Sequence, residues 1–263
     1  MLLRMITKCV MITRCYQNTF SGGFSALQLP LINPSADYLT MPTRRLPENH
    51  TDRKVEELHF LVHPAVNLNM EINEIYLDTM DSVDRYSESY WRNAKRHDRR
   101  LLKAYHRKID SLGENDALGI LLPNFPSQLK QDASENREWV EIARYGKQKL
   151  GRRCVVVSAP LIIKSIRQFR RNVENVVETL RSRGLTINKK RPVSVWGQEF
   201  FPCVPAHTHA IDQMGFRKIS IPLEATSAGF CSENEIERLR EMVNSQPPTR
   251  VKFTLNGKPL TQK

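Results

Sequence analysis

The strongest constraint on the fold of this chain is an alternation of short, continuous apolar runs with longer amphipathic segments. The apolar runs occupy residues 58–64, 116–123, 153–158, 192–196 and 217–222. A strand that is apolar on both of its faces must be covered on both faces, which is typical of parallel sheets enclosed by helices. The runs therefore predict a mainly parallel sheet rather than a β-sandwich.

The segments between these runs have the spacing of helices. Apolar side chains recur every three, four or seven residues over 71–111, as one long helix or as two helices with a start at Asp81-Ser82. Further helices are predicted over 135–150, from Pro160 to Gly184, over 205–214 and after Ser232, with a last strand over 249–255. We therefore predict an α/β fold, a Rossmann-like three-layer sandwich with a five- to six-stranded, mainly parallel sheet.

Regular patterning begins at Val55, which predicts a single α/β domain over 55–263 and a flexible leader and linker over 1–54. The first 36 residues contain no Asp or Glu and include Arg4, Lys8 and Arg14. Such a segment is either a disordered leader, a targeting peptide or the product of an upstream start codon. Of the three, we favour the disordered leader.

The chain is strongly basic, with 40 Lys and Arg residues against 28 Asp and Glu residues and a net charge of +12. This charge favours polyanionic partners. Its densest segment, 91–108, contains the candidate nucleic-acid contacts Arg92, Arg96, Arg99, Arg100 and Lys103. The alternative is a solvated outer helix face. The spacing of Tyr90 and Tyr105 places these aromatic residues on the apolar side of the helix rather than among the cations.

The five cysteines are scattered and form no CxxC pair, which favours free thiols in a reducing, cytoplasmic location. No run of about 18 apolar residues occurs, so no transmembrane helix is predicted. His207 and His209 stand two residues apart and point to different helix faces, so no metal site is predicted. Glycine-rich phosphate loops do not follow any predicted strand, and we expect no nucleotide cofactor.

Cys203 is the best candidate for a chemical site. It follows the apolar run 192–196 and begins a predicted helix, and the positive end of a helix dipole favours the thiolate form. Ligands of open α/β sheets bind beyond the carboxyl ends of the strands, where His63 is also expected, and His207 lies one helical turn after Cys203. The alternative is a small, buried cysteine that only fills space.

The segment around Cys203 resembles the cysteine segment of isochorismatase-like hydrolases. The matching residues are Gly197, Cys203-Val204, Gly215 and the run Glu224-Ala-Thr-Ser-Ala228. The resemblance implies a cysteine nucleophile, at Cys203, that acts on amide or related bonds of a small-molecule substrate with the help of an Asp and a Lys.

Two positions depart from that pattern. The chain has Val62-His63-Pro64 where the family has its Asp, and Ser158-Ala159-Pro160 where it has its Lys. The first hypothesis is therefore either an isochorismatase-like cysteine hydrolase, with His63 and His207 in proton transfer, or a relative without catalysis. The second is a non-enzymatic nucleic-acid-binding or interaction protein that uses the basic helix. A weaker third is a secreted effector.

Overall fold

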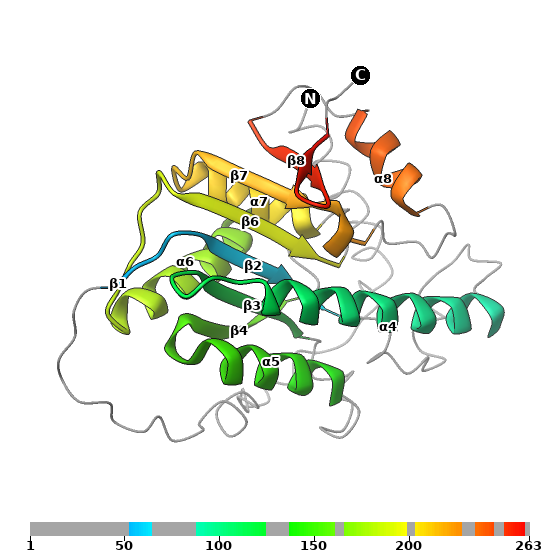
Figure 1. The fold of residues 1–263 in the computed structure, drawn as a ribbon, viewed down its shortest axis with the longest axis horizontal. Coiled ribbons are helices and arrows are strands. Elements are labelled where there is room, and N and C mark those ends of the chain that lie inside the picture. The colour runs from blue at the N-terminus through cyan, green and yellow to red at the C-terminus, as the bar shows by residue number, and fades with distance from the viewer. Residues whose placement is uncertain are drawn as a thin grey trace, which may run out of the picture.

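We analysed a computed structural model of the 263-residue chain, which describes residues 53–64, 88–124, 137–160, 166–198, 203–227, 235–244 and 250–260. Its main element is a seven-stranded sheet with the order β4-β3-β2-β6-β7-β8-β9 (Figure 1). All pairs are parallel except β8 and β9, which form a hairpin. The α/β class and the mainly parallel sheet predicted from the sequence are confirmed.

The bounds of the strands lie close to the apolar runs. The strands of the main sheet are β2 (Leu58–Val62), β3 (Ala117–Asn124), β4 (Cys154–Pro160), β6 (Pro192–Gly197), β7 (Lys218–Pro222), β8 (Lys252–Leu255) and β9 (Lys258–Pro259). A separate parallel pair joins β1 (Arg53–Lys54) to β5 (Leu185–Thr186).

Helices cover both faces of the sheet. On one face lie α4 (Glu88–Asp110) and α5 (Arg137–Leu150), and on the other lie α6 (Ile166–Ser182), α7 (Cys203–Gln213) and α8 (Glu235–Asn244). Short 3-10 turns, Gly151–Arg153 and Leu223–Ala225, precede β4 and follow β7. None of the described helices is apolar over a length that could span a membrane.

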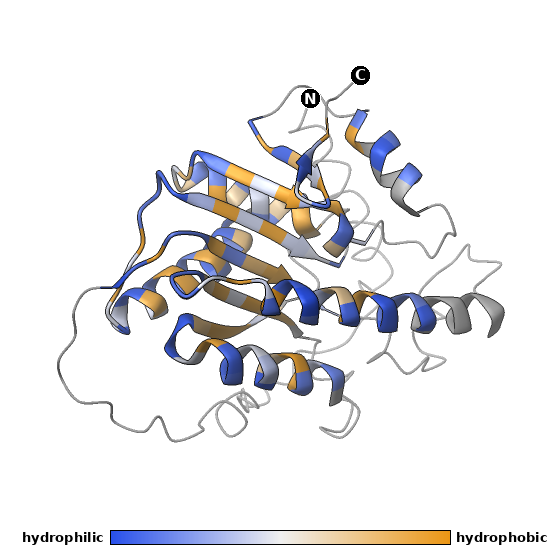
Figure 2. Cartoon of the chain, viewed as in Figure 1, coloured by the Kyte–Doolittle hydropathy of each residue, from blue (hydrophilic) through white to orange (hydrophobic). Residues whose placement is uncertain are grey.

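The sheet has a separate apolar core on each of its two faces, because successive side chains of a strand point to opposite faces. Phe60 and Val62 of β2 join the core under α6 and α7, whereas Leu61 joins the core under α4 and α5. Tyr105 of α4 packs against Trp196 of β6 in this second core, with ring centroids 5.7 Å apart. Figure 2 shows the resulting hydrophobic bands on the strands and the blue, hydrophilic outer faces of the helices.

Two sequence-based expectations change in the structure. Pro160 was expected to open a helix, but it ends β4, where it pairs with Asn124, and α6 begins at Ile166. The main sheet has seven strands instead of the five or six expected, because the chain turns at Asn256-Gly257 and forms β9. The expected helix start at Asp81-Ser82 and most of the leader lie outside the described residues, although Arg53 and Lys54 form β1.

Candidate functional site

The strand order places a topological switch point between β2 and β6. From β2 the chain adds β3 and then β4 on one side, and from β6 it adds β7 and then β8 on the other. The crossover helices therefore leave the two central strands toward opposite faces, and side chains just beyond these strands face a natural ligand position. His63 follows β2, and Gly197 leads toward Cys203 at the start of α7.

His63 has an unusual combination of backbone strain and burial. Its φ of 44° lies in the left-handed region, which side chains other than glycine seldom adopt. The ring is fully buried, and neither of its nitrogens makes a hydrogen bond within the described part of the chain. Burial, with His207 nearby, lowers the pKa of His63 to about 3, although the Ala159 carbonyl acts in the opposite direction. His63 is therefore a neutral base at physiological pH.

His207 faces His63 from α7. The two ring centroids are 5.9 Å apart and the rings are nearly perpendicular, while Phe169 packs against His207 at 4.8 Å. Nδ1 of His207 lies 2.8 Å from the carbonyl oxygen of Cys203, and Nε2 lies 3.5 Å from the side-chain nitrogen of Asn172. Because a carbonyl only accepts, Nδ1 donates the hydrogen and Nε2 accepts from Asn172. Burial lowers the pKa of His207 to about 4, so this ring is also neutral.

Cys203 is the first residue of α7, two residues earlier than the start predicted from the sequence. Its side chain is buried in the apolar core under α6 and α7, and its backbone carbonyl contacts His207 one helical turn later. The first N–H groups of a helix have no partner within the helix and are available to a negatively charged atom. Cys154 at the start of β4 has a different environment: burial raises the pKa of its thiol to about 12, which keeps it protonated.

Gly197 fixes how closely β2 and β6 approach at this edge. Its φ is 133°, and a side chain at this position would overlap the backbone of Val62. The next residue, Gln198, donates its backbone N–H to the Val62 carbonyl at 2.9 Å, and Ser227 donates its own to the Gly197 carbonyl at 3.0 Å. The chain that leads to Cys203 is thus held against the residue that precedes His63.

Two buried polar contacts at this edge were missed in the sequence. The side chain of Gln198 donates a 2.8 Å hydrogen bond to Asp98 of α4, which is fully buried, and His97 lies 3.6 Å from the same oxygen. Asp98 stands three residues before Leu101 and seven before Tyr105, so helical spacing alone could have placed it on the inner face. The contact of Asn172 with His207 joins α6 to α7, and no local sequence pattern indicates it.

The remaining candidate positions divide between core and surface. Val204 of the resemblance is buried, and Gly215, with φ 88°, ends α7. Glu224 lies in the 3-10 turn Leu223–Ala225, and Thr226, just after this turn, forms a β-bridge with Gly197. His209 contacts Gln213 at 2.9 Å, and the described residues contain no group of three His, Cys, Asp or Glu side chains that would suit a metal ion.

The predicted nucleic-acid contacts lie on α4, away from the histidine cluster. Arg96, Arg99, Arg100 and Lys103 are exposed, whereas the side chain of Arg92 lies outside the described residues. Tyr105 is fully buried, as its spacing predicted, and is not available to stack on bases. The structure therefore places the rings of His63 and His207 in contact and joins His207 to the backbone of Cys203, and it places the basic residues on a separate surface.

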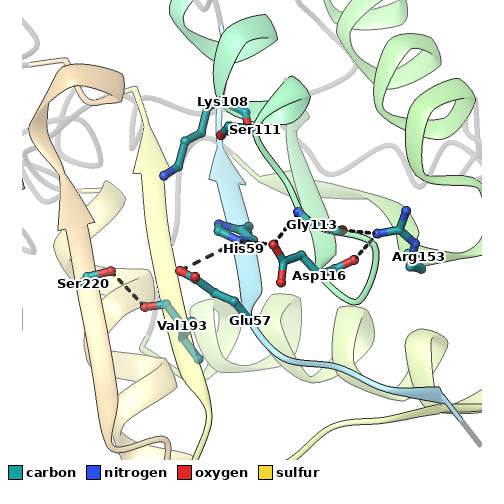
Figure 3. Close-up of polar contacts among 9 residues, drawn as sticks. All are labelled: Glu57, His59, Lys108, Ser111, Gly113, Asp116, Arg153, Val193 and Ser220. Atoms are coloured by element: carbon teal, nitrogen blue, oxygen red, sulfur yellow. Dashed lines mark hydrogen bonds and ion pairs between the residues drawn. The ribbon is translucent and has the colours of Figure 1, made fainter. Parts of the chain in front are cut away.

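A second polar cluster lies at the amino edge of the sheet (Figure 3). Nε2 of His59 is 3.8 Å from Glu57 and 3.9 Å from Asp116. The His59 imidazole, and to a smaller extent the Gly113 N–H at 2.7 Å, hold the pKa of Asp116 below its usual range. Arg153 donates to the Gly113 and Asp116 carbonyls at 2.8 and 2.7 Å. These contacts close the turn between α4 and β3, which indicates a structural cluster.

No protein-family model, curated protein or solved structure matches the chain.

Proposed function

We propose that the chain is a cysteine-dependent hydrolase of amide-type bonds, in the manner of the isochorismatase-like hydrolases that its 197–228 segment resembles. The observation that carries the proposal is His63. A strained, fully buried histidine with two unbonded nitrogens costs folding free energy, and such costs concentrate at functional sites. Its position beyond β2, beside the α7 cluster that begins with Cys203, supplies a base next to a nucleophile.

His63 is the favoured proton acceptor of the two histidines. His207 already uses Nδ1 for the Cys203 carbonyl and Nε2 for Asn172, so its role is to hold the start of α7. Neither nitrogen of His63 makes a hydrogen bond of good geometry within the described residues, although the Ala159 carbonyl lies close enough to act on its pKa. The two histidines, given equal roles in the sequence-based hypothesis, thus receive different ones.

In the proposed reaction, Sγ of Cys203 attacks the carbonyl carbon of the substrate and forms a C–S bond. The thiol proton passes to His63 and then to the leaving nitrogen as the C–N bond breaks. Water next attacks the thioester, giving a proton to His63, which returns it to the departing Cys203 sulfur. Because burial lowers the pKa of His63 to about 3, His63 is a weak base; it accepts the thiol proton only as the C–S bond forms, and it gives the proton up readily to the leaving nitrogen. Backbone N–H groups at Val204 would stabilise the oxyanion.

The test combines thiol labelling with turnover. Iodoacetamide at pH 7, with the labelled peptides identified by mass spectrometry, should modify Cys203 far faster than Cys154, whose raised pKa makes it an internal control. The protein should hydrolyse p-nitrophenyl acetate, as an activated ester probe, and Cys203→Ala should abolish this activity. His63→Asn should lower the rate by about 100-fold or more, and asparagine tolerates the left-handed backbone at this position. His209→Asn, on the same helix as Cys203, should leave the rate unchanged.

Two results would contradict the proposal. Equal labelling of Cys203 and Cys154 would mean that Cys203 is a buried apolar residue. Rapid labelling without turnover of ester or amide probes would identify a relative that retains the thiol but not the hydrolysis.

A further inference from the structure

The outer face of α4 is an exposed row of positive charge. Its exposed cations are Arg96, Arg99, Arg100, Lys103 and Arg107. Spacings of four, three and four residues separate Arg96, Arg100, Lys103 and Arg107. Residues at such spacings lie on one side of a helix. At a rise of 1.5 Å per residue the row is about 16 Å long. In Figure 2 the described part of α4 is mostly blue, with orange positions between the blue ones.

Four of the five cations in the row have no ion pair within the described part of the chain. Among the described residues, Arg96, Arg99, Lys103 and Arg107 have no carboxylate within ion-pair distance. By contrast, Arg170 pairs with Glu174 at 2.7 Å and Lys149 with Asp110 at 3.2 Å. A face of like charges that repel one another along a helix is unfavourable for stability, and this indicates an external partner.

The chemistry of the row selects the class of partner. Leu101, Tyr105 and Ile109 of the same helix are buried in the core, so between residues 96 and 107, where the side chains are described, Tyr105 is not available for an unpaired base to stack on. Its exposed positions between 96 and 107 are all charged, whereas a helix that lies on a bilayer also inserts an apolar face. Cations without rings or apolar anchors suit the phosphates of a duplex.

We propose that the outer face of α4 binds the phosphate backbone of double-stranded nucleic acid without reading its sequence. This activity goes beyond the proposed hydrolase and does not use Cys203 or His63. About four phosphates would be contacted, one for each of the cations without an ion pair. Counterion release then gives a slope of log K against log salt concentration of about −3.6.

The experiment measures fluorescence anisotropy of a labelled 20-base-pair DNA duplex with the full chain. Between 50 and 200 mM KCl the affinity should fall roughly 150-fold, which is the value given by this slope. The variant R96E/R99E/K103E/R107E should lose binding. The matched control R181E/K189E/K190E/K218E makes the same change of net charge at other exposed cations and should keep most of the affinity.

Three results would overturn the proposal: equal losses in the two variants, a salt slope near zero, or tighter binding to phosphatidylserine vesicles than to the duplex. If the charge-reversal variant does not fold, as judged by circular dichroism, R96Q/R99Q/K103Q/R107Q answers the same question. Cys203→Ala should bind the duplex like the unmodified protein, and the α4 variant should keep the iodoacetamide reactivity of Cys203. The two proposals can therefore fail separately.

Discussion

Strand β2 has a buried histidine at each end, and their surroundings differ. His59, near the amino end, lies between the carboxylates of Glu57 and Asp116. His63, just past the carboxyl end, has only aromatic and backbone neighbours among the described residues and a left-handed backbone. The amino edge combines opposite charges and closed turns, whereas the carboxyl edge combines strain with neutral polar groups. This difference separates an edge organised for stability from an edge organised for chemistry.

The largest effect should come from the backbone contact at the carboxyl edge. Gly197→Ala would place a methyl group inside the backbone of Val62 at a φ of 133°, so we expect a loss of about 4 kcal/mol in the free energy of unfolding. The control is Gly151→Ala at the amino edge, where φ is 57° but no atom lies within 4 Å of the added carbon. That change should cost about 1 kcal/mol. Urea unfolding measures both, and equal losses would contradict the close approach.

The two edges should also respond to different pH ranges. His63 and His207 have folded-state pKa values near 3 and 4, below the ordinary value of 6.5, so the unfolded chain binds more protons as the pH falls below about 6.5. Each should remove roughly 2 kcal/mol of stability between pH 7 and pH 5. Asp116, with a lowered pKa, stabilises the fold above its ordinary value of 3.8 and loses this effect only at more acidic pH.

Urea unfolding at pH 7 and pH 5 tests this difference. His63→Asn should reduce the loss between the two pH values by about half, because one of the two histidines with a lowered pKa no longer titrates. Asp116→Asn should leave that loss nearly unchanged. The same loss in the unmodified protein and in His63→Asn would show that His63 is not buried in the neutral form.

A smaller effect is expected for the contact between α4 and the chain before Cys203. Gln198→Leu removes the 2.8 Å hydrogen bond to the buried Asp98 carboxylate, which should cost about 2 kcal/mol. Because Gln198 also holds the backbone that leads to Cys203, the rate of iodoacetamide labelling at Cys203 should change. A stability loss with an unchanged labelling rate would assign Gln198 a purely structural role.

The smallest effect is expected at the amino edge. Arg153→Gln removes charged hydrogen bonds to the Gly113 and Asp116 carbonyls of a partly exposed turn, and should cost about 1 kcal/mol. The labelling rate of Cys203 should stay the same, since the whole length of the sheet separates the two positions. A change in that rate would show that the edges are coupled.

Most of the fold could be predicted from the sequence because burial on both faces leaves a local signature. Each of the five predicted apolar runs became a strand of the sheet, and Gly151 and Gly184 adopt the left-handed backbone typical of helix ends. The predicted helix start at Pro160 was wrong because a proline suits both the first turn of a helix and the end of an edge strand. Local preference alone does not distinguish these two uses.

The site could be predicted only in part. The rule that ligands bind beyond parallel strands pointed to His63 and to the chain before Cys203, and helical spacing placed His207 on the same helix. The positive φ of His63, the pairing of Nδ1 of His207 with a backbone carbonyl, and the Gln198–Asp98 contact depend on segments far apart in the chain. These contacts decide which histidine is free to accept a proton, and no local pattern encodes them.

The parallel pairing of β2 with β6 has a consequence for how the molecule is synthesised. Leu58 pairs with Val193, so the first strand of the main sheet waits for the fourth while α4, β3, α5, β4 and α6 emerge from the ribosome. Pairings between segments distant in sequence form slowly because a long loop must close first. The nascent chain can assemble β2, β3 and β4 early, but His63 meets its partners on α7 only when the second half arrives. Truncation before residue 192 would therefore remove β6 and leave one side of β2 open to aggregation.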